Sequence, residues 1–327
     1  MRSARSRLGL SLGLLVLAAG AASAATPLPV KALKAAEPEK SRKVRELPGE
    51  PVEFKTVDGW TLKGQYLPSG TGKWTFILLH EAGGSKQNWY WISRKMKARG
   101  LGFLALDLRG HGLSQAAPEG QPSSFRRFKS SKDNNDWDNM REDISSAVAF
   151  LKEKGVDPVN VALGGAAVGG SVAIRYAALH PEVPLVFLLS PGMSHQGVPT
   201  PNALRAYKKR PLLLVVGDDD KRSSAEIPII FQFARLGAGA ENVYLLRVPR
   251  GHGTRMLYYN RGVMDRILDW AEDPTQSDFE TSISSAPSAG AAAGVPATAP
   301  QPPASRDGLP TEDELDKEYG DPPKGGE

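Results

Sequence analysis

The sequence predicts an α/β fold with a mainly parallel, doubly wound sheet and helices on both of its faces. Short, continuous apolar runs recur along the middle of the chain, as expected for strands that are buried on both sides. Between them lie segments whose apolar residues repeat about every 3.6 residues, which is the period of an amphipathic helix. Because strands alternate with helices, right-handed crossovers join them into a parallel sheet with two helical layers.

The elements follow one another in a regular order. Two alternating runs around Asp58 and Gly59 predict an N-terminal antiparallel hairpin, because Asp-Gly favours the tight turn between paired strands. Buried strands are expected at 74–80, 102–108, 159–165, 184–190 and 211–217, with a last strand at 243–248. Amphipathic helices are expected at 88–100, 139–155, 170–180, 223–237 and 261–273. Only a short segment connects the strands at 184–190 and 211–217, so we expect no large lid.

The first 24 residues differ from this middle part. Arg2, Arg5 and Arg7 precede an apolar run at 8–19, and Ala-Ser-Ala follows at 22–24. This pattern predicts a signal peptide over 1–24, because the apolar run is too short to span a membrane. The alternative is an uncleaved N-terminal anchor. We therefore expect an exported protein, periplasmic or secreted, that has no transmembrane segment after cleavage.

Residues 25–50 and 276–327 flank the predicted domain at 51–275. The first segment is polar, Lys-rich and interrupted by Pro, which is typical of a linker. The second contains mainly Ala, Pro, Ser and Gly, so burial of apolar surface cannot offset the entropy of ordering it, and we expect a disordered tail. The tail carries ten acidic and three basic residues, a net charge of −7 (3 − 10), whereas the whole chain carries +5. The domain between the signal peptide and the tail is therefore basic. Its positive surface either attracts anionic components of the cell envelope or the acidic tail, or it is an ordinary solvated surface.

The composition excludes several kinds of site. The sequence contains no cysteine, which excludes disulfides, a thiolate nucleophile and cysteine-ligated metal. A large hydrophobic core must therefore stabilise this fold without cross-links. We expect no cofactor and no nucleic-acid partner, and no oligomeric state is indicated.

Chemically active side chains follow the buried strands, at the edge where parallel sheets bind ligands. His80 ends one run and opens the short loop Glu-Ala-Gly-Gly, three aspartates at 218–220 follow Gly217, and His252 lies in a Gly-rich loop after the last strand. Two of these groups also have a reading without catalysis. His80 is then a structural histidine in a turn, and the aspartates are then an N-cap or a cation site. Three consecutive aspartate side chains diverge, so we expect no metal.

Five blocks in this order resemble the α/β-hydrolase superfamily over residues 50–275: LLHEAGG, DLRGHGLS, LSPG, Gly-x-x-Asp and GHGT. The resemblance is to the exported or cytoplasmic group that includes members related to dienelactone hydrolases and serine aminopeptidases. It implies that Asp220 is the acid of a catalytic triad, with Asp219 as the second choice, and that His252 is the general base.

The resemblance also implies an oxyanion hole and a structural histidine. The hole would be formed by the backbone N–H groups of Ala82, in the loop after the first buried strand, and of Val168. His111 lies in the block that supports such sites without taking part in the chemistry, and it is expected to be structural.

The segment at 165–169 departs from the family pattern. It reads Gly-Ala-Ala-Val-Gly where these hydrolases have Gly-x-Ser-x-Gly, so Ala167 stands at the position of the nucleophile. Alanine has no lone pair with which to attack a carbonyl, and no acyl-enzyme forms there. The alternatives are a relocated nucleophile at Ser171, Ser190 or Ser114. We expect a natural substitution; an engineered serine-to-alanine change is the other explanation.

Two functions of different classes follow from this pattern. The first is a non-catalytic pseudohydrolase that binds an acyl, peptide or glycan ligand, or a protein partner. The second is an active ester or amide hydrolase that uses Asp220 and His252 with activated water or a relocated serine. A purely structural role is a third reading.

Overall fold

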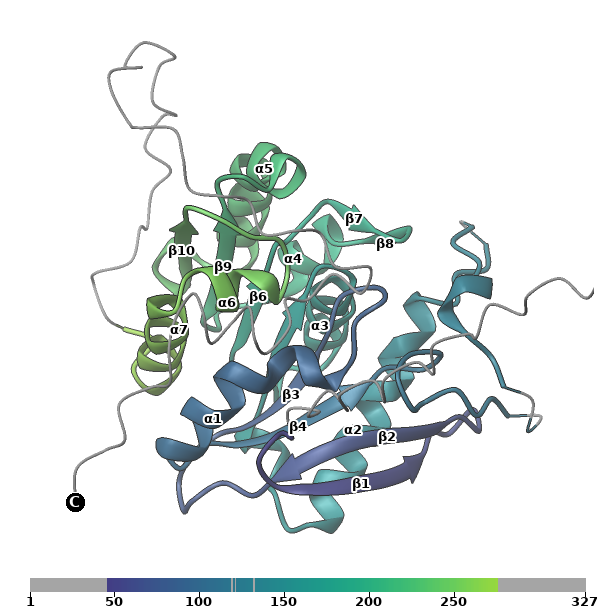
Figure 1. Ribbon diagram of the computed structural model, residues 1–327. Coiled ribbons are helices and arrows are strands. Elements are labelled where there is room, and N and C mark those ends of the chain that lie inside the picture. The colour runs from purple at the N-terminus through teal and green to yellow at the C-terminus, as the bar shows by residue number, and fades with distance from the viewer. Residues whose placement is uncertain (1–45, 119, 121, 132, 276–327) are drawn as a thin grey trace, which may run out of the picture. The chain divides into compact units, whose positions relative to one another are not determined.

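The computed structural model describes residues 46–275 except 119, 121 and 132, and Figure 1 shows their arrangement. The predicted signal peptide, most of the predicted linker and the predicted tail lie outside the described residues. Leu47 is buried and β1 begins at Glu50, so the folded part starts a few residues before the expected boundary at 51. None of the described helices has both the length and the apolar character needed to cross a membrane.

The main sheet has eight strands in the order β1-β2-β4-β3-β5-β6-β9-β10. The pairs β1–β2 and β2–β4 are antiparallel, and all other pairs are parallel. The predicted mainly parallel sheet with an N-terminal hairpin is therefore confirmed. The strands of this sheet are β1 (Glu50–Lys55), β2 (Thr61–Leu67), β3 (Thr75–Leu79), β4 (Gly102–Asp107), β5 (Val161–Ala166), β6 (Val186–Leu189), β9 (Leu212–Gly217) and β10 (Val243–Val248).

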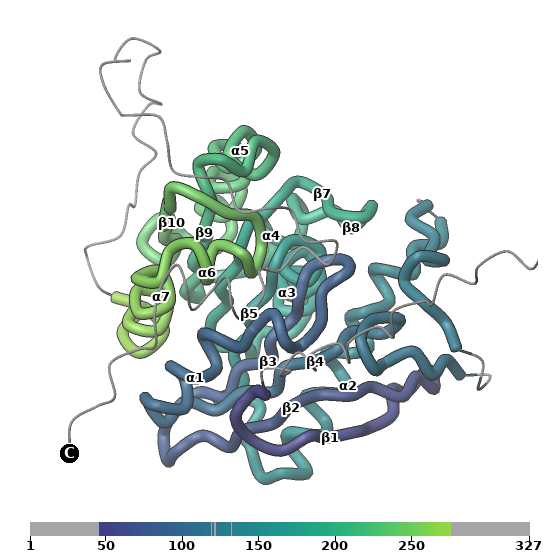
Figure 2. Tube along the Cα trace, viewed as in Figure 1, coloured from purple at the N-terminus to yellow at the C-terminus, as the bar shows by residue number. Residues whose placement is uncertain are grey.

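Helices cover both faces of the sheet. They are α1 (Tyr90–Ala98), α2 (Arg141–Glu153), α3 (Val168–Leu179), α4 (Pro201–Ala206), α5 (Lys221–Ala238), α6 (Arg255–Tyr259) and α7 (Gly262–Glu272). The helices α1, α6 and α7 lie side by side, as Figure 2 shows, and share one hydrophobic cluster with the sheet. The helices α2 to α5 contribute to the cluster on the opposite face.

Strand β3 shows why the buried strands read as continuous apolar runs. Phe76 and Leu78 belong to the cluster beneath α1 and α7, whereas Ile77 and Leu79 belong to the cluster beneath α2 to α5. Successive side chains of a strand point to opposite faces, so a strand covered on both faces is apolar at nearly every position. The one polar residue of β3 is Thr75, at its first position.

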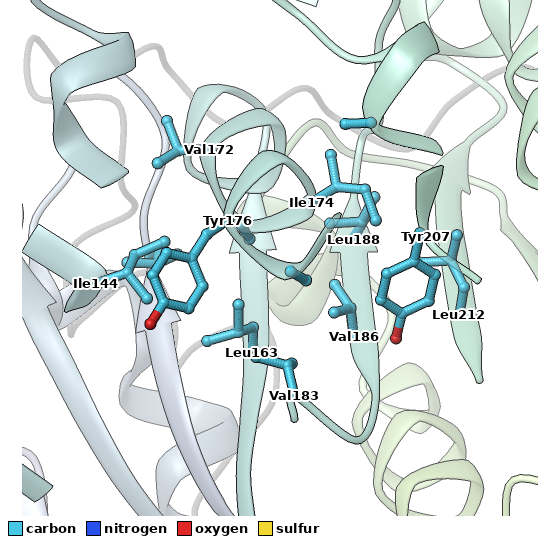
Figure 3. Packing of buried hydrophobic residues seen from close by; sticks show 14 of the residues in the cluster. Ile144, Leu163, Val172, Ile174, Tyr176, Val183, Val186, Leu188, Tyr207 and Leu212 are labelled. Carbon is cyan, nitrogen blue, oxygen red and sulfur yellow. The ribbon is translucent and has the colours of Figure 1, made fainter. Parts of the chain in front are cut away.

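Figure 3 shows the packing beneath α3. Ile174 and Tyr176 of this helix lie over the sheet near Leu163 of β5 and Val186 of β6, and Ile144 of α2 closes the same layer. All five side chains are fully or almost fully buried. This layer fixes α3 on the sheet, and α3 begins at the segment where the sequence departs from the hydrolase pattern.

The sequence did not predict the shortest elements. These are α4, α6 and a small hairpin formed by β7 (Ser194–His195) and β8 (Val198–Pro199). Such short segments contain too few residues to show a period. The connection from β6 to β9 holds only this hairpin and α4, so the expectation of no large lid is correct.

Candidate active site

Ala167 lies at a sharp turn between β5 and α3. Its backbone has φ 46° and ψ −111°, a conformation that is strained for any residue with a Cβ atom. The N–H of Ala167 donates a hydrogen bond to the carbonyl of Leu189 at 2.9 Å, and 5% of the residue is exposed. A strand, a strained turn and a helix are the geometry that presents a nucleophile in serine hydrolases. Here the turn presents a methyl group.

Two glycines allow this turn to pack closely. A Cβ atom on Gly165 would lie 2.6 Å from the backbone nitrogen of Gly170, and one on Gly169 would lie 2.6 Å from the carbonyl oxygen of His80. Real Cβ contacts essentially never fall below 3.0 Å. The first turn of α3 therefore rests directly on the backbone at the end of β3, and only glycine fits at these positions.

Asp220 and His252 are brought together from loops that are far apart in the sequence. Asp220 is the N-cap of α5 and accepts a hydrogen bond from the backbone N–H of Ser223. Nδ1 of His252 donates to Oδ2 of Asp220 at 2.7 Å, since an ionised carboxylate only accepts. The side chain of Asp220 is 6% exposed and that of His252 is 48% exposed. Nε2 of His252 has no hydrogen-bond partner among the described residues.

The neighbouring aspartates have other partners. Asp219 accepts a hydrogen bond from the N–H of Gly251 at 2.6 Å, and Asp218 forms an ion pair with Arg247. The three side chains diverge, as expected. Among residues 46–275, apart from the three that are not described, no cluster of acidic and histidine side chains forms a metal site.

The pair of Asp220 and His252 has strongly perturbed acidities. Burial raises the pKa of Asp220, but hydrogen bonds from His252 and Ser190 outweigh it and hold this pKa far below its ordinary value. The hydrogen bond to Asp220 raises the pKa of His252 against the opposing effect of burial, and the charge of Glu81 adds to the rise. A carboxylate that orients a histidine and stabilises its imidazolium form is the arrangement of a triad base.

The structure also places the two predicted oxyanion donors. Ala82 lies in the turn closed by the hydrogen bond from the N–H of Gly84 to the carbonyl of Glu81, and Val168 is the first residue of α3. Neither N–H donates a hydrogen bond to a described protein atom. The contact between Gly169 and the backbone of His80 brings the two segments together.

The three alternative nucleophiles are engaged elsewhere. Ser171 donates to the carbonyl of Ala167 at 3.3 Å within α3. Ser114 is buried and accepts from the N–H of Lys63 at 2.8 Å. Ser190 is buried and accepts from the N–H of Gly253 at 2.8 Å. None of these three hydroxyl groups is hydrogen bonded to His252.

Two buried histidines support the loop that carries Ala82. His80 donates from Nδ1 to the carbonyl of Glu81 at 2.7 Å and accepts at Nε2 from the N–H of Leu108 at 3.1 Å. The ring of His111 lies 4.9 Å from that of His80 and stacks on Phe125 at 4.1 Å. Burial lowers the pKa of His80, and it lowers the pKa of His111 to about 3. Both rings are neutral packing groups at physiological pH.

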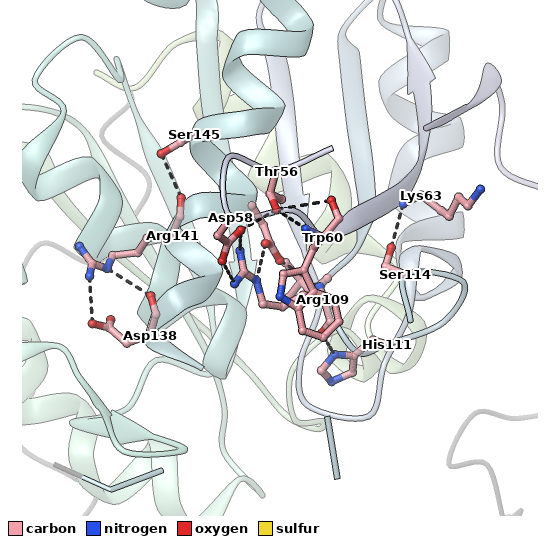
Figure 4. Close-up of polar contacts among 12 residues, drawn as sticks. Thr56, Asp58, Trp60, Lys63, Arg109, His111, Ser114, Asp138, Arg141 and Ser145 are labelled. Atoms are coloured by element: carbon pink, nitrogen blue, oxygen red, sulfur yellow. Dashed lines mark hydrogen bonds and ion pairs between the residues drawn. The ribbon is translucent and has the colours of Figure 1, made fainter. Parts of the chain in front are cut away.

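An ion-pair network anchors the segment that carries His111. The guanidinium of Arg109 pairs with Asp143 and with Asp58, each at 2.6 Å, and Figure 4 shows Arg109, Asp58 and Trp60 close together beside His111. Asp58 belongs to the turn of the N-terminal hairpin. The network therefore ties that hairpin, the loop after β4 and α2 into one support.

Sequence reasoning did not identify Glu81 as part of the site. Its Oε1 accepts from the hydroxyl of Thr254 at 2.6 Å and from the side-chain amide of Asn88 at 3.0 Å. It thus connects the Ala82 loop to the loop of His252. The signal was present, because an acidic residue occupies the second position of a loop that is His-Gly-Gly-Gly in many lipases and esterases.

Sequence reasoning also missed the second role of Ser190. It was considered only as a nucleophile, whereas its contacts with Asp220 and Gly253 make it a support for the pair of Asp220 and His252. Its φ of 51° is unusual for a serine. His195 packs on the same side, with its ring 6.3 Å from that of His252 and Nε2 donating to the carbonyl of Ser190 at 3.1 Å.

Comparison with known families and curated proteins gives consistent matches. The family described as serine aminopeptidase, S33, matches residues 71–224. The chain is 28% identical over 217 residues to the thiohydrolase apmlB of Arthrinium phaeospermum, which covers 65% of this chain and 64% of that protein. It is 30% identical over 146 residues to the polyketide transferase ATR5 of Stachybotrys chlorohalonatus. This match covers 43% of this chain and 44% of that protein. The chain thus spans less than two thirds of the length of these relatives.

Solved structures agree on the architecture. The esterase Pf2001 of Pyrococcus furiosus superposes with a TM-score of 0.55 at 20% identity, covering 68% of this chain and 89% of that one. The alpha/beta hydrolase GrgF of Penicillium sp. sh18 superposes with a TM-score of 0.55 at 16% identity, covering 69% and 98%. At these identities the likeness shows the fold.

Proposed function

We propose, from the premise that this chain belongs to the α/β-hydrolase superfamily, that it is an exported pseudohydrolase which binds an acyl ligand without forming an acyl-enzyme. The observation that carries the proposal is Ala167 at the strained turn between β5 and α3. The parts that position a nucleophile are retained around a residue that has no nucleophilic atom.

The missing hydroxyl removes most of the catalytic power of such a site. In serine hydrolases, loss of the nucleophile lowers kcat by roughly a million-fold, because the acid, the base and the nucleophile act as a unit. What remains is binding by the oxyanion donors, together with a general base that acts on water. The hydrogen bond between His252 and Asp220 and the two unpaired N–H groups of Ala82 and Val168 therefore favour ligand binding over turnover.

The names of the relatives support an acyl ligand over a peptide or a glycan. One curated relative is named a thiohydrolase and another a polyketide transferase, and a structural neighbour is named an esterase. Export is supported by the signal-peptide pattern at 1–24. Fractionation of the source cells tests it, because a protein recovered in the cytoplasm with residues 1–24 still attached contradicts export.

A second candidate is a hydrolase that attacks its substrate with water. The observation that favours it is the intact hydrogen bond between Asp220 and His252, with Nε2 of His252 free. In this candidate, water held beside Nε2 is the nucleophile, and His252 removes its proton as the general base. This candidate predicts slow turnover that depends on His252 and has no covalent intermediate.

Steady-state hydrolysis of p-nitrophenyl butyrate separates the two candidates. The pseudohydrolase predicts the same background rate for the natural protein and for His252→Gln. Water activation predicts that the natural protein is faster and that His252→Gln removes the difference. His180→Gln is the matched control, since this half-buried histidine follows the other end of α3 and pairs with Glu182.

A further inference from the structure

Helix α1 carries cations on two of its sides, and α7 neutralises one of them. Lys95 forms an ion pair with Asp265, and Arg99 forms ion pairs with Asp265, Asp269 and Glu272. Lys95 and Arg99 are four residues apart and therefore share one side of the helix. The acidic residues of α7 thus balance the charge of α1 along the contact between the two helices.

A second side of α1 is basic and has no such balance. Arg94 and Lys97 are three residues apart, are both exposed and line a hollow of the surface together with Tyr90 and Glu46. Neither cation forms an ion pair with a carboxylate in the part of the chain that the structure describes. Glu46 offsets one of the two charges, and the other is left uncompensated.

Aromatic rings connect this side of α1 to a further arginine. Arg94 donates a hydrogen bond to the hydroxyl of Tyr90 at 2.9 Å, and its guanidinium lies 5.6 Å from the centre of that ring. The ring of Trp91 lies 5.1 Å from the ring of Tyr90. The guanidinium of Arg261 lies 5.6 Å from the centre of the Trp91 ring.

Arg250 extends the same line of cations. The side-chain amide of Asn260 donates to the carbonyl of Arg250 at 2.6 Å, and the guanidinium of Arg250 lies 4.8 Å from the centre of the Tyr259 ring. A guanidinium that lies on a ring keeps its N–H edge for a carboxylate, which it binds through two hydrogen bonds. A basic strip therefore runs over α1 and both ends of α6, and it consists of Arg94, Lys97, Arg250 and Arg261.

We infer that the basic strip binds the acidic segment 312–318 of this same chain. The segment reads Glu-Asp-Glu-Leu-Asp-Lys-Glu, with five carboxylates and one ammonium group, a net charge of −4 (1 − 5). It is the densest acidic run of the predicted tail, and it lies outside the described residues. Its charge is opposite to that of the strip, and the inference does not depend on the proposed function.

The point at which the tail begins places this segment within reach of the strip. Thr275 follows Glu272 by three residues, and Glu272 pairs with Arg99 beside the C-terminal end of α1. Thirty-six residues (311 − 275) separate Thr275 from residue 312, and a flexible linker of this length spans about 30–36 Å. The 9 residues of α1 extend over only about 14 Å.

The tether also makes weak contacts sufficient. A single exposed ion pair contributes little, but a tethered partner is present at an effective concentration in the millimolar range. An anionic lipid surface or the tail of a second copy offers the same charge without this advantage. The tail of the same chain is therefore the occupant that the observations favour.

A spin label on the tail tests the inference in the full chain. The sequence has no cysteine, so Tyr319→Cys provides a unique attachment point next to the acidic segment. At about 0.1 M NaCl, we expect the label to broaden the amide resonances of Arg94 and Lys97 in the 15N-labelled protein. At about 1 M NaCl, where charges are screened beyond about 3 Å, the broadening is expected to disappear.

Two sets of variants remove the charges from either side. Arg94→Glu with Lys97→Glu is expected to abolish the broadening along α1. Lys152→Glu with Lys208→Glu is the matched control and is expected to keep it, because these exposed lysines lie on α2 and after α4, on the opposite face of the sheet. An unchanged midpoint of urea unfolding shows that both double variants are folded.

Neutralising the tail itself gives a second measurement that leaves the folded domain untouched. The triple change Glu312→Gln, Glu314→Gln and Glu318→Gln is expected to abolish the broadening along α1. Asp278→Asn with Glu280→Gln is the matched control, because it lowers the charge of the tail outside the acidic segment, and it is expected to leave the broadening unchanged.

Four results overturn the inference. They are no broadening along α1 at low salt, broadening that survives both the strip variant and the triple change, and broadening of a 15N-labelled chain by the spin label of a second chain. The last of these places the tail of another copy on the strip. The fourth is binding to phosphatidylglycerol vesicles that depends on Arg94 and Lys97 and is equally tight with and without the triple change, since the strip then serves a lipid surface.

Discussion

Gly169→Ala tests whether the close approach of α3 to β3 builds the site. A Cβ atom at this position lies 2.6 Å from the carbonyl oxygen of His80, at least 0.4 Å (3.0 − 2.6) inside the closest approach that Cβ atoms show, and still closer to the carbonyl oxygen of Leu79. Both neighbours are backbone atoms at the end of a buried strand, so they cannot move aside as a side chain would. Overpacking of this kind costs about 3 kcal/mol.

Helix propensity opposes this cost by about 1 kcal/mol, since alanine is favoured over glycine within a helix. The net expectation for Gly169→Ala is a loss of about 2 kcal/mol in the free energy of unfolding, which lowers Tm by about 4–8 °C for a domain of this size. Gly170→Ala is the matched control, because its Cβ atom would lie 3.1 Å from the nearest atom, the carbonyl oxygen of Gly165.

Urea unfolding followed by tryptophan fluorescence measures both variants. The expected order of stability is Gly170→Ala near the natural protein and Gly169→Ala well below it. If Gly169→Ala is as stable as Gly170→Ala, the first turn of α3 does not rest on the end of β3 as described. The placement of Val168 beside the Ala82 loop would then be wrong as well.

Three further variants test the support of the site. Asp220→Asn is expected to lower the pKa of His252, as seen by NMR titration, and to lower the free energy of unfolding by about 2 kcal/mol at pH 7. Because folding depresses the pKa of Asp220, the difference in stability between the variant and the natural protein should shrink as the pH falls below about 4. A difference that stays constant with pH contradicts this expectation. Arg109→Gln leaves Asp143 buried without its counter-ion and should lower the free energy of unfolding by about 3 kcal/mol at pH 7. Burial already raises the pKa of Asp143 to about 6, so urea unfolding should show a smaller loss of stability at pH 4. Equal losses at both pH values refute this account of the ion pair. The double variant Ser190→Ala with Ala167→Ser is expected to be acylated at the new serine about tenfold more slowly than Ala167→Ser alone, as measured in a stopped-flow ester assay. An unchanged rate shows that Ser190 does not support Asp220.

The sequence predicted the sheet well because burial leaves a strong pattern. Strands covered on both faces contain mainly apolar residues and glycine, and the helices between them repeat apolar residues about every 3.6 positions. All six buried strands and five helices were therefore found with their ends within two residues of the observed ones. The hairpin β7–β8 and the helices α4 and α6 were missed for the opposite reason. Each is held by its neighbours and is too short to carry a period of its own.

The parts of the site that could be predicted are those marked by a short sequence pattern. The turn at 165–169 and the loop of His252 carry glycines at fixed spacing, so both were located from the sequence. The Gly-x-x-Asp spacing of the family pattern selected Asp220 ahead of Asp219, and Asp220 is the aspartate that contacts His252. The contact of Asp219 with the N–H of Gly251 depends on the direction of its side chain, which spacing does not give. The place of Glu81 in its loop was a local signal, but its contact with Thr254 joins residues 173 positions apart, and the sequence does not show which residue Glu81 contacts.

The most direct test of the central claim is covalent labelling with a fluorophosphonate ester, read by mass spectrometry of the intact protein and its peptides. The natural protein is expected to remain unlabelled, and Ala167→Ser is expected to gain one phosphonyl group at residue 167 that His252→Gln prevents. This outcome shows a hydrolase site that lacks only its nucleophile. Labelling of the natural protein at Ser114, Ser171 or Ser190, or a folded Ala167→Ser that stays unlabelled, contradicts the account.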